Sequence, residues 1–253
     1  MGDAMKLIVT GASGRMGREM LNAVAATDGR MTVAAAVDIS GVPIEGIPTY
    51  TSLSDVCEDA DVLVDFSHHS ATADLLAFAK AKRMPLVIAT TGQTDEERAA
   101  ILAAAAECPI FFSGNMSIGI ALLVSLARQA AAVFPEADVE IVEVHHNKKL
   151  DVPSGTALML AEGVREVREG GDIVVGRHEN GARKKGEIGV HSLRMGNIVG
   201  RHEVRLDTGT QTIVLGHEAH SRALFAEGAL RAAEFIVDRK AGLYNVRDLL
   251  TVK

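Results

Sequence analysis

The densest group of chemically active residue types lies between Val139 and Ala157, in the run VEIVEVHHNKKLDVPSGTA. His145 and His146 end an apolar, extended stretch, and an imidazole titrates near neutrality, so it can donate a proton where a reaction leaves negative charge. Because successive side chains of a strand point to opposite faces, both histidines can serve one site only if the chain leaves the sheet there. The pair therefore predicts an acid–base site at the end of a strand.

A predicted anion site follows the two histidines. Lys148 and Lys149 supply positive charge, and the run PSGT at 153–156 precedes an apolar helical pattern. Hydroxyls and free N–H groups at a helix N-terminus bind anions. Carboxylates fit this segment better than phosphates: the hydroxyls and N–H groups of Ser154 to Thr156 can hold one, and a lysine is available for charge pairing. The alternative is that the histidines are surface residues and that PSGT is an ordinary helix cap.

A second anion site is predicted by the run VTGASGRMG, which places Gly11, Gly14 and Gly17 between an apolar run and a helical pattern. Glycines there let the backbone approach a pyrophosphate, whose charge meets free N–H groups and the positive end of a helix dipole. The spacing is GxxGxxG, not the commoner GxGxxG. Asp38 ends the next apolar run about 20 residues on, where a carboxylate accepts hydrogen bonds from ribose hydroxyls. Together these features predict a nicotinamide dinucleotide site, and the alternative is a plain turn with a strand cap.

Residues around this loop predict which cofactor binds. Asp38 would repel a 2′-phosphate and Ile39 offers no guanidinium to receive one, so NADH is preferred and NADPH is possible. Small polar residues end two further strands, where a ribose and a carboxamide would fit; ordinary turn chemistry is the alternative. These segments are Ala89-Thr90-Thr91-Gly92 and Ser113-Gly114-Asn115-Met116.

The elements that must position these residues follow from apolar patterning. Before Asn115, unbroken apolar runs alternate with Ala-rich helical patterns, as in a parallel sheet covered on both faces. After it, two helices and several strand-like runs suggest a second domain, and a last helix returns to the first. The expected strands are 6–10, 32–37, 62–66, 86–90 and 110–112, then 139–146, 188–193, 198–206 and 211–215. The expected later helices are 118–134, 156–168 and 223–238.

The resulting fold class is α/β: a Rossmann-type doubly wound parallel sheet with a second α+β domain built on a mixed or antiparallel sheet. Residues 1–116 and 223–253 form the expected dinucleotide-binding domain, and residues 117–222 form the expected substrate-binding domain. Thr94 and Glu97 also predict the start of one helix through a capping box.

Composition excludes several classes of protein. The 253 residues carry 26 Lys and Arg against 33 Asp and Glu, a formal charge of −7, so we expect no nucleic-acid partner, which would need a basic face. No apolar run approaches the ~20 residues that span a bilayer, and two cysteines without a signal-peptide pattern predict the cytoplasm. No metal is predicted, because the His217-x-x-His220 spacing stands alone; sheet-face or core roles are expected for those two histidines and for His191 and His202.

The sequence resembles the 4-hydroxy-tetrahydrodipicolinate reductase family, also called dihydrodipicolinate reductase, of the diaminopimelate route to lysine. HHNKKLDVPSGTA matches the family's HHxxKxDxPSGTA, and GASGRMGR, ATTG, SGNMSIGI and RMGNIVGRH agree, so the resemblance runs from about Lys6 to Leu250. It implies NAD(P)H-dependent reduction of a dehydrated cyclic imine dicarboxylate to tetrahydrodipicolinate. It also implies a homotetramer assembled through the second domain's sheet.

The resemblance assigns roles at matching positions. His145 matches the proposed proton donor and Lys149 a lysine with a catalytic role. Implied substrate-binding residues are His146, Lys149, Ser154, Gly155 and Thr156. Implied cofactor-binding residues are Gly11, Ala12, Ser13, Gly14, Arg15, Met16, Asp38, Ala89, Thr90, Thr91, Ser113, Gly114, Asn115 and Met116. Arg222 resembles a family arginine near the cofactor, and Gly17 is assigned to helix packing.

Three departures from the family pattern stand out. Ile39 replaces an arginine common in members, Ser113 and Gly114 replace two alanines, and His68 and His69 stand where an Arg-Pro-like pair is frequent. The implied reaction delivers hydride from NADH to C4 of the ring while His145, assisted by Lys149, protonates a neighbouring carbon, which requires the two anion sites to meet. Two alternatives stay open: another nicotinamide-dependent dehydrogenase of a small acid, and a non-catalytic NADH-binding redox sensor.

Overall fold

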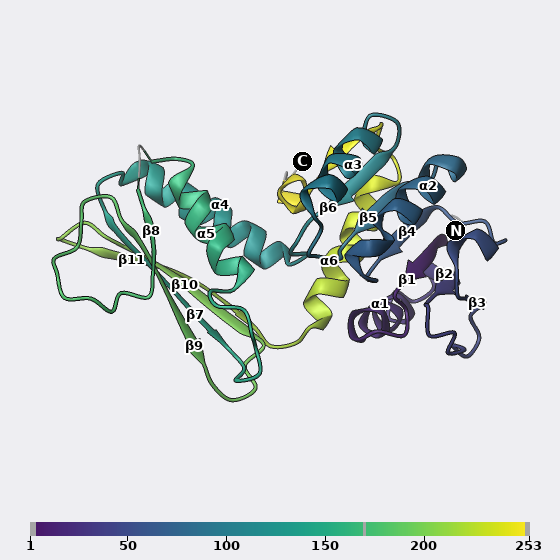
Figure 1. The fold of residues 1–253 in the computed structure, drawn as a ribbon, viewed down its shortest axis with the longest axis horizontal. Coiled ribbons are helices and arrows are strands. Elements are labelled where there is room, and N and C mark those ends of the chain that lie inside the picture. The colour runs from purple at the N-terminus through teal and green to yellow at the C-terminus, as the bar shows by residue number, and fades with distance from the viewer. Residues whose placement is uncertain (1–3, 169–170, 251–253) are drawn as a thin grey trace. The chain divides into compact units, whose positions relative to one another are not determined.

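The computed structural model describes residues 4–168 and 171–250, and the chain divides into two compact units. The first unit runs through Ile118 and resumes at Arg222, and the second is Gly119–Ser221 (Figure 1). Among the described residues, no helix is long and apolar enough to cross a bilayer.

The first unit is built on a seven-stranded, wholly parallel sheet in the order β12-β6-β5-β4-β1-β2-β3. From β1 the chain proceeds outward to β3 and then restarts on the other side of β1 with β4. The strand order therefore reverses between β1 and β4, and doubly wound sheets bind ligands at that point, beyond the carboxyl ends of the strands. The strands are β1 (Met5–Thr10), β2 (Met31–Val37), β3 (Thr49–Tyr50), β4 (Val62–Asp65), β5 (Leu86–Ile88), β6 (Pro109–Phe112) and β12 (Gly242–Tyr244).

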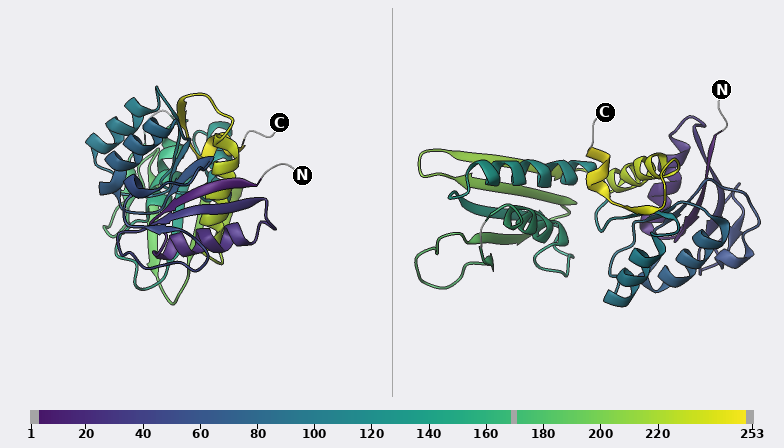
Figure 2. Two further views of the ribbon diagram at one scale, coloured as in Figure 1. Left: turned by 90° about the vertical axis from the view of Figure 1, so that its right-hand side faces the viewer. Right: turned by 90° about the horizontal axis from the view of Figure 1, so that it is seen from above.

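Helices cover both faces of this sheet, which explains why its central strands are buried without polar alternation. Figure 2 shows α1 and α6 on one face and α2 and α3 on the other. Their bounds are α1 (Arg15–Ala25), α2 (Thr72–Lys82), α3 (Asp95–Ala104) and α6 (Ala223–Ile236). Thr94 and Glu97 form the predicted capping box at the start of α3. Short 3₁₀ turns are η1 (Leu53–Asp55), η2 (His69–Ala71) and η3 (Val246–Leu250).

The second unit is a five-stranded mixed sheet in the order β11-β10-β7-β9-β8. β7 is parallel to β9 and antiparallel to β10. α4 (Ile118–Val133) and α5 (Gly155–Arg165) pack on one face, where they bury an apolar core that includes Val139, Ile141 and Leu160 (Figure 1). The strands are β7 (Asp138–His145), β8 (Ile173–Val175), β9 (Ile188–Arg194), β10 (Gly200–Asp207) and β11 (Thr212–Ala219).

The predicted fold class is confirmed, because a doubly wound parallel sheet and a second, mixed sheet are both present. The predicted strand at 211–215 is longer than expected, since β11 continues to Ala219 as the antiparallel partner of β10. The sequence did not predict β3, β8 and β12, each of which has only two or three residues.

Candidate active site

A pocket of about 370 Å³ lies at the carboxyl ends of β1, β2 and β4 in the first unit. It therefore occupies the position where the strand order reverses. Three of the predicted cofactor residues, Gly11, Gly14 and Asp38, line it. The other lining residues are Thr10, Val37, Ile39, Thr51, Ser52, Leu53, Phe66, Ser67, His68, Ser70, Ala71, Asp74 and Leu75.

The glycine turn is shaped by contacts that leave no room for side chains. Gly11 has φ +69°, and a Cβ there would lie 2.4 Å from the carbonyl oxygen of Phe66. A Cβ at Gly17 would lie 2.1 Å from the carbonyl oxygen of Gly11. Gly14 is the N-cap of α1 and makes no side-chain cap, so this helix N-terminus can offer backbone N–H groups to a ligand.

Asp38 is tied directly to this turn. Its Oδ2 accepts a 2.9 Å hydrogen bond from the backbone N–H of Ser13, and its Oδ1 accepts one of 3.0 Å from Ser40. Burial acts to raise the pKa of Asp38, but the hydrogen bonds from Ser40 and Ser13 outweigh it and leave the pKa below its ordinary value. The pocket therefore contains a fixed negative charge, next to Ile39, which is 95% exposed.

The segments after β5 and β6 adjoin each other at the same edge of the sheet. A Cβ at Gly114 would lie 3.9 Å from Cγ2 of Thr91, but these segments do not line the 370 Å³ pocket. Two buried hydroxyls among the predicted cofactor residues, on Ser13 and Thr90, have no hydrogen-bond partner in the described part of the chain. Buried polar atoms are normally satisfied, so both are available to a bound ligand.

Other predicted residues of the first unit are placed as follows. Ala12 is buried and Arg15 is exposed at the start of α1, next to half-buried Met16. Arg222 is half-buried at the N-cap of α6 and does not line the 370 Å³ pocket.

The structure also shows what surrounds His68 and His69, for which the sequence suggested no role. His68 lines the pocket, with its Nδ1 2.9 Å from Oγ of Ser70. The Nδ1 of His69 lies 3.0 Å from Oε2 of Glu97, the capping-box residue of α3. His68 therefore belongs to the pocket, whereas His69 joins two helical segments.

In the second unit the histidine segment lies at the carboxyl end of β7, the central strand of the sheet. β7 ends at His145, and His146 begins the loop, so the chain leaves the sheet where a shared site requires it to. His145 is buried, and its Nδ1 lies 2.5 Å from Oε2 of Glu143. The imidazole ring packs edge-on against that of His202, with centroids 5.1 Å apart.

Glu143 is the most enclosed charge of this cluster. Its side chain is fully buried and forms a bidentate ion pair with Arg194, in which each Nη atom lies 2.9 Å from one carboxylate oxygen. Burial alone would raise the pKa of Glu143, but hydrogen bonds from Arg194, His145 and the Ser154 backbone lower it to about 2. The carboxylate is therefore ionised at neutral pH.

The pKa values of both buried histidines are lowered. Burial lowers the pKa of His145 despite the neighbouring Glu143 carboxylate, and Lys149 and Arg194 act in the same direction as burial. Burial lowers the pKa of His202 to about 3, with a further contribution from His145. His202 is thus neutral at physiological pH, and its Nε2 lies 3.2 Å from Oγ of Ser154.

The predicted anion segment is a helix N-terminus, as expected. Ser154 is the N-cap of α5, and its Oγ accepts a hydrogen bond of 3.2 Å from the N–H of Ala157. Gly155 and Thr156 form the first turn. Lys149 extends from the preceding loop, where its Nζ is 2.9 Å from Oδ1 of Asp151. Half-buried His146 has a buried Nδ1 without a hydrogen-bond partner among the residues described.

Glu143 and Arg194 are not predicted by the sequence, which indicates only a core or sheet-face role for His202. One signal for Glu143 was available: it lies two residues before His145 on a strand, so both side chains point to the same face. Arg194 had no such signal, because it lies on β9, 51 residues from Glu143.

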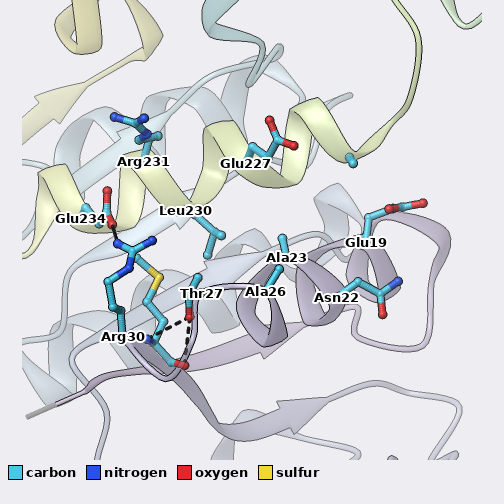
Figure 3. Close-up of a pocket in the computed structure, with 12 residues that line it drawn as sticks. Glu19, Asn22, Ala23, Ala26, Thr27, Arg30, Glu227, Leu230, Arg231 and Glu234 are labelled. Carbon is cyan, nitrogen blue, oxygen red and sulfur yellow. Dashed lines mark hydrogen bonds and ion pairs between the residues drawn. The ribbon is translucent and has the colours of Figure 1, made fainter.

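A second pocket, of about 460 Å³, lies between α1 and α6 of the first unit. Figure 3 shows its lining of small and charged residues, including the 3.2 Å ion pair between Arg30 and Glu234. None of the predicted site residues lines it. Across residues 4–168 and 171–250, no group of three or more His, Cys, Asp or Glu side chains is arranged to hold a metal ion.

A glycine turn that opens α1, an acidic residue at the end of β2 and a pocket where the strand order reverses define the class of dinucleotide-binding α/β proteins. The second unit adds a cluster of titratable side chains around His145 and a helix N-terminus that begins at Ser154.

Comparisons with known proteins specify the family. Family models described as "Dihydrodipicolinate reductase, N-terminus" and "Dihydrodipicolinate reductase, C-terminus" match residues 5–116 and 119–250. The 4-hydroxy-tetrahydrodipicolinate reductase of Caldanaerobacter subterraneus subsp. tengcongensis is 43% identical over 97% of this chain and 98% of that protein. The reductase of Alkaliphilus metalliredigens is 41% identical over 97% and 99%.

Comparison with solved structures also finds a dihydrodipicolinate reductase. Dipicolinate-bound dihydrodipicolinate reductase from Paenisporosarcina sp. TG-14 has a TM-score of 0.83 and 26% identity, covering 98% of this chain and all of that one. The C. glutamicum DAP dehydrogenase shares only the fold, with a TM-score of 0.62 and 15% identity over 100% of this chain and 97% of that one. The chain belongs to the dihydrodipicolinate reductase family, whose enzymes are NAD(P)H-dependent oxidoreductases.

Proposed function

We propose that this chain is a 4-hydroxy-tetrahydrodipicolinate reductase that reduces the dehydrated cyclic imine dicarboxylate to tetrahydrodipicolinate in the diaminopimelate route to lysine. The observation that carries the proposal is the cluster at the end of β7, where His145 and the N-terminus of α5 adjoin through Glu143 and His202. Because the chain belongs to a family of reductases, we assign this cluster two roles: a proton donor and a binding site for carboxylates.

The first unit fits a dinucleotide. The turn at Gly11 admits no side chain, Ser13 and Thr90 have unsatisfied hydroxyls, and Asp38 faces the pocket. The proposed cofactor residues are Gly11 to Met16, Asp38, Ala89 to Thr91 and Ser113 to Met116. We assign NADH as the preferred cofactor and NADPH as a possible one, because the ionised Asp38 disfavours a 2′-phosphate and the exposed Ile39 supplies no positive charge.

The N-terminus of α5 is the proposed site for a substrate carboxylate. Ser154 caps the helix and Gly155 and Thr156 form its first turn, where a helix end presents positive potential to an anion, and His146 and Lys149 lie in the loop just before them. The buried, unsatisfied Nδ1 of His146 supports a ligand there. The relative from Paenisporosarcina is described with dipicolinate bound, and a planar ring with two carboxylates is the chemical class that we propose here.

The proposed chemistry divides between a hydride and a proton. When bound, reduced nicotinamide would supply a hydride to C4 of the substrate ring, and the ring would then need a proton. His145 donates the proton from Nε2, an atom with no hydrogen-bond partner among the described residues. Lys149 pairs with a substrate carboxylate and assists His145. Holding both carboxylates fixes the ring's orientation, which contributes to the rate.

We propose that residues 1–116 with 223–253 form the dinucleotide-binding domain and that residues 117–222 form the substrate-binding and oligomerisation domain of a cytoplasmic homotetramer. The sheet face opposite α4 and α5 supports the assembly, because it presents half-buried Val142 and Val144 and exposed Leu193 and Val214. Light scattering on the purified full chain tests this, and a monomer at micromolar concentration would contradict it.

The activity itself is tested by following NADH absorbance after adding freshly made product of the preceding synthase step. We expect rapid oxidation of NADH and formation of tetrahydrodipicolinate. Turnover only with a different small acid would indicate another dehydrogenase. NADH binding without turnover of any of these acids would indicate a redox sensor.

A further inference from the structure

One carboxylate joins the two functional segments of the second unit. Oε2 of Glu143 lies 2.5 Å from Nδ1 of His145, and its Oε1 accepts a 3.1 Å hydrogen bond from the backbone N–H of Ser154. The Glu143 side chain is completely buried. It therefore contacts both the proposed proton donor and the first residue of the proposed carboxylate site, while its burial keeps it from the substrate.

Arg194 fixes the orientation of that carboxylate. Its Nη1 lies 2.9 Å from Oε2 of Glu143 and its Nη2 lies 2.9 Å from Oε1, a bidentate pair in which the planar guanidinium matches the planar carboxylate. The same Nη2 donates a 2.7 Å hydrogen bond to the carbonyl oxygen of Asp151, whose side chain pairs with Lys149. The arginine thus connects the carboxylate to the loop that carries the proposed catalytic lysine.

The contact between the Glu143 carboxylate and Nδ1 of His145 determines which ring nitrogen of His145 carries the proton. An ionised carboxylate only accepts hydrogen bonds, so the Nδ1 of His145 must be the donor. Neutral His145 then has its lone pair on Nε2, and its protonated form has an N–H there. A Cβ at residue 200 would lie 3.0 Å from this Nε2, so the glycine at that position leaves the approach to the atom open.

We propose that Glu143, held by Arg194, is the positioning residue that fixes the tautomer of His145 and aligns its Nε2 beside the N-terminus of α5. The proposal rests on the function proposed above. The groups facing His145 are Glu143 on its own strand, Arg194 on β9, His202 on β10 and Lys149 in the following loop. Lys149 and Arg194 disfavour protonation of the imidazole, so Glu143 is the group that balances the charge of the proton-donating form.

The test is Glu143→Gln in the full chain. We expect kcat to fall by about 10²- to 10³-fold, within the range for loss of general acid–base catalysis, with unchanged affinity for NADH. The alkaline limb of the pH profile should move to lower pH, because the imidazolium loses its counter-ion. Nitrogen-15 NMR, assigned with His145→Gln, should show loss of the Nδ1–H tautomer.

Glu140→Gln is the matched control. Glu140 lies on the same strand but on the opposite face. Like the carboxylate of Glu143, its carboxylate contacts one arginine and one histidine, which here are Arg183 and His191. This control should keep the wild-type kcat, pH profile and His145 tautomer.

Glu143→Gln leaves Arg194 without its counter-ion, so Glu143→Gln with Arg194→Gln is the second variant if the first does not fold. Glu143→Asp keeps the charge and should recover part of the pH profile. A folded variant lacking the Glu143 carboxylate, with wild-type kcat, pH profile and tautomer, would overturn the proposal. If the wild-type chain itself does not oxidise NADH, the proposed function fails, and the tautomer measurement still tests the positioning role.

Discussion

The backbone N–H of Ser13 donates a 2.9 Å hydrogen bond to Oδ2 of Asp38, so the glycine turn and the acidic end of β2 are joined directly. This contact places a fixed carboxylate in the pocket of the first unit. It also leaves the carboxylate with free lone pairs for ribose hydroxyls, because each oxygen accepts more than one hydrogen bond.

Asp38→Ala should therefore weaken NADH binding by about tenfold or more, the range for hydrogen bonds to a charged group, and should weaken NADPH binding less. Fluorescence titration with both nucleotides measures this. Asp74→Ala is the control, because Asp74 is another carboxylate of the same pocket and its loss should leave the NADH-to-NADPH ratio unchanged. Equal losses for both cofactors in Asp38→Ala would remove Asp38 from the ribose site.

His145→Gln should lower kcat by about 10²- to 10⁴-fold, as expected for loss of a general acid. NADH affinity should not change, because His145 belongs to the second unit. Steady-state kinetics and nucleotide titration separate these effects. His191→Gln is the control, since His191 contacts Glu140 on the other face of the sheet. Wild-type turnover in His145→Gln would end the proton-donor assignment.

Lys149→Ala should raise KM for the dicarboxylate and also lower kcat, because the lysine both pairs with a carboxylate and assists His145. Lys148→Ala offers a neighbouring comparison: Lys148 is exposed and falls at a variable position of the motif. Initial rates over a range of substrate concentrations give both constants. If the two variants had the same KM and kcat, Lys149 would have no special role.

His202 should make the second unit sensitive to acid. Its pKa is about 3 in the folded chain against an ordinary 6.5, so the unfolded chain binds an extra proton between these values. The free energy of unfolding is then fully present above pH ~6.5 and falls as the pH drops towards ~3, by at most about 1.4 kcal/mol for each pH unit. His145, whose pKa is also lowered, acts in the same direction.

Urea unfolding of the full chain between about pH 7 and about pH 5 tests this linkage. His202→Phe should flatten the dependence on pH, whereas His220→Phe, at an exposed position, should not. A slope in His202→Phe as steep as in the wild type would show that His202 is not the group responsible.

The first unit was predictable from sequence because its signals are local. Unbroken apolar runs gave the strands, and the glycine turn and Asp38 adjoin the ends of two of them. β12 could not be predicted, because three residues, Gly242–Tyr244, carry no pattern and join the sheet only by pairing with β6.

The candidate site of the second unit was predictable only in part. His145, Lys149 and Ser154 lie within one motif, but the groups that hold them come from other strands. Arg194 meets Glu143 because β9 pairs with β7 in a register that sets Arg194 beside His145, and His202 arrives through the antiparallel pairing of β10. Such registers depend on the assembled sheet, so the motif could identify the chemistry and not its supporting contacts.

In the proposed reaction, hydride would come from the reduced cofactor to the ring of a dicarboxylate, and His145 would pass a proton from solvent to the same ring. This reaction is tested by analysing the product made with NADH deuterated at the transferring position in ordinary water, and with unlabelled NADH in heavy water. We predict cofactor deuterium at C4 in the first product and solvent deuterium on a neighbouring ring carbon in the second. A product without deuterium from the labelled cofactor would contradict hydride transfer to the ring.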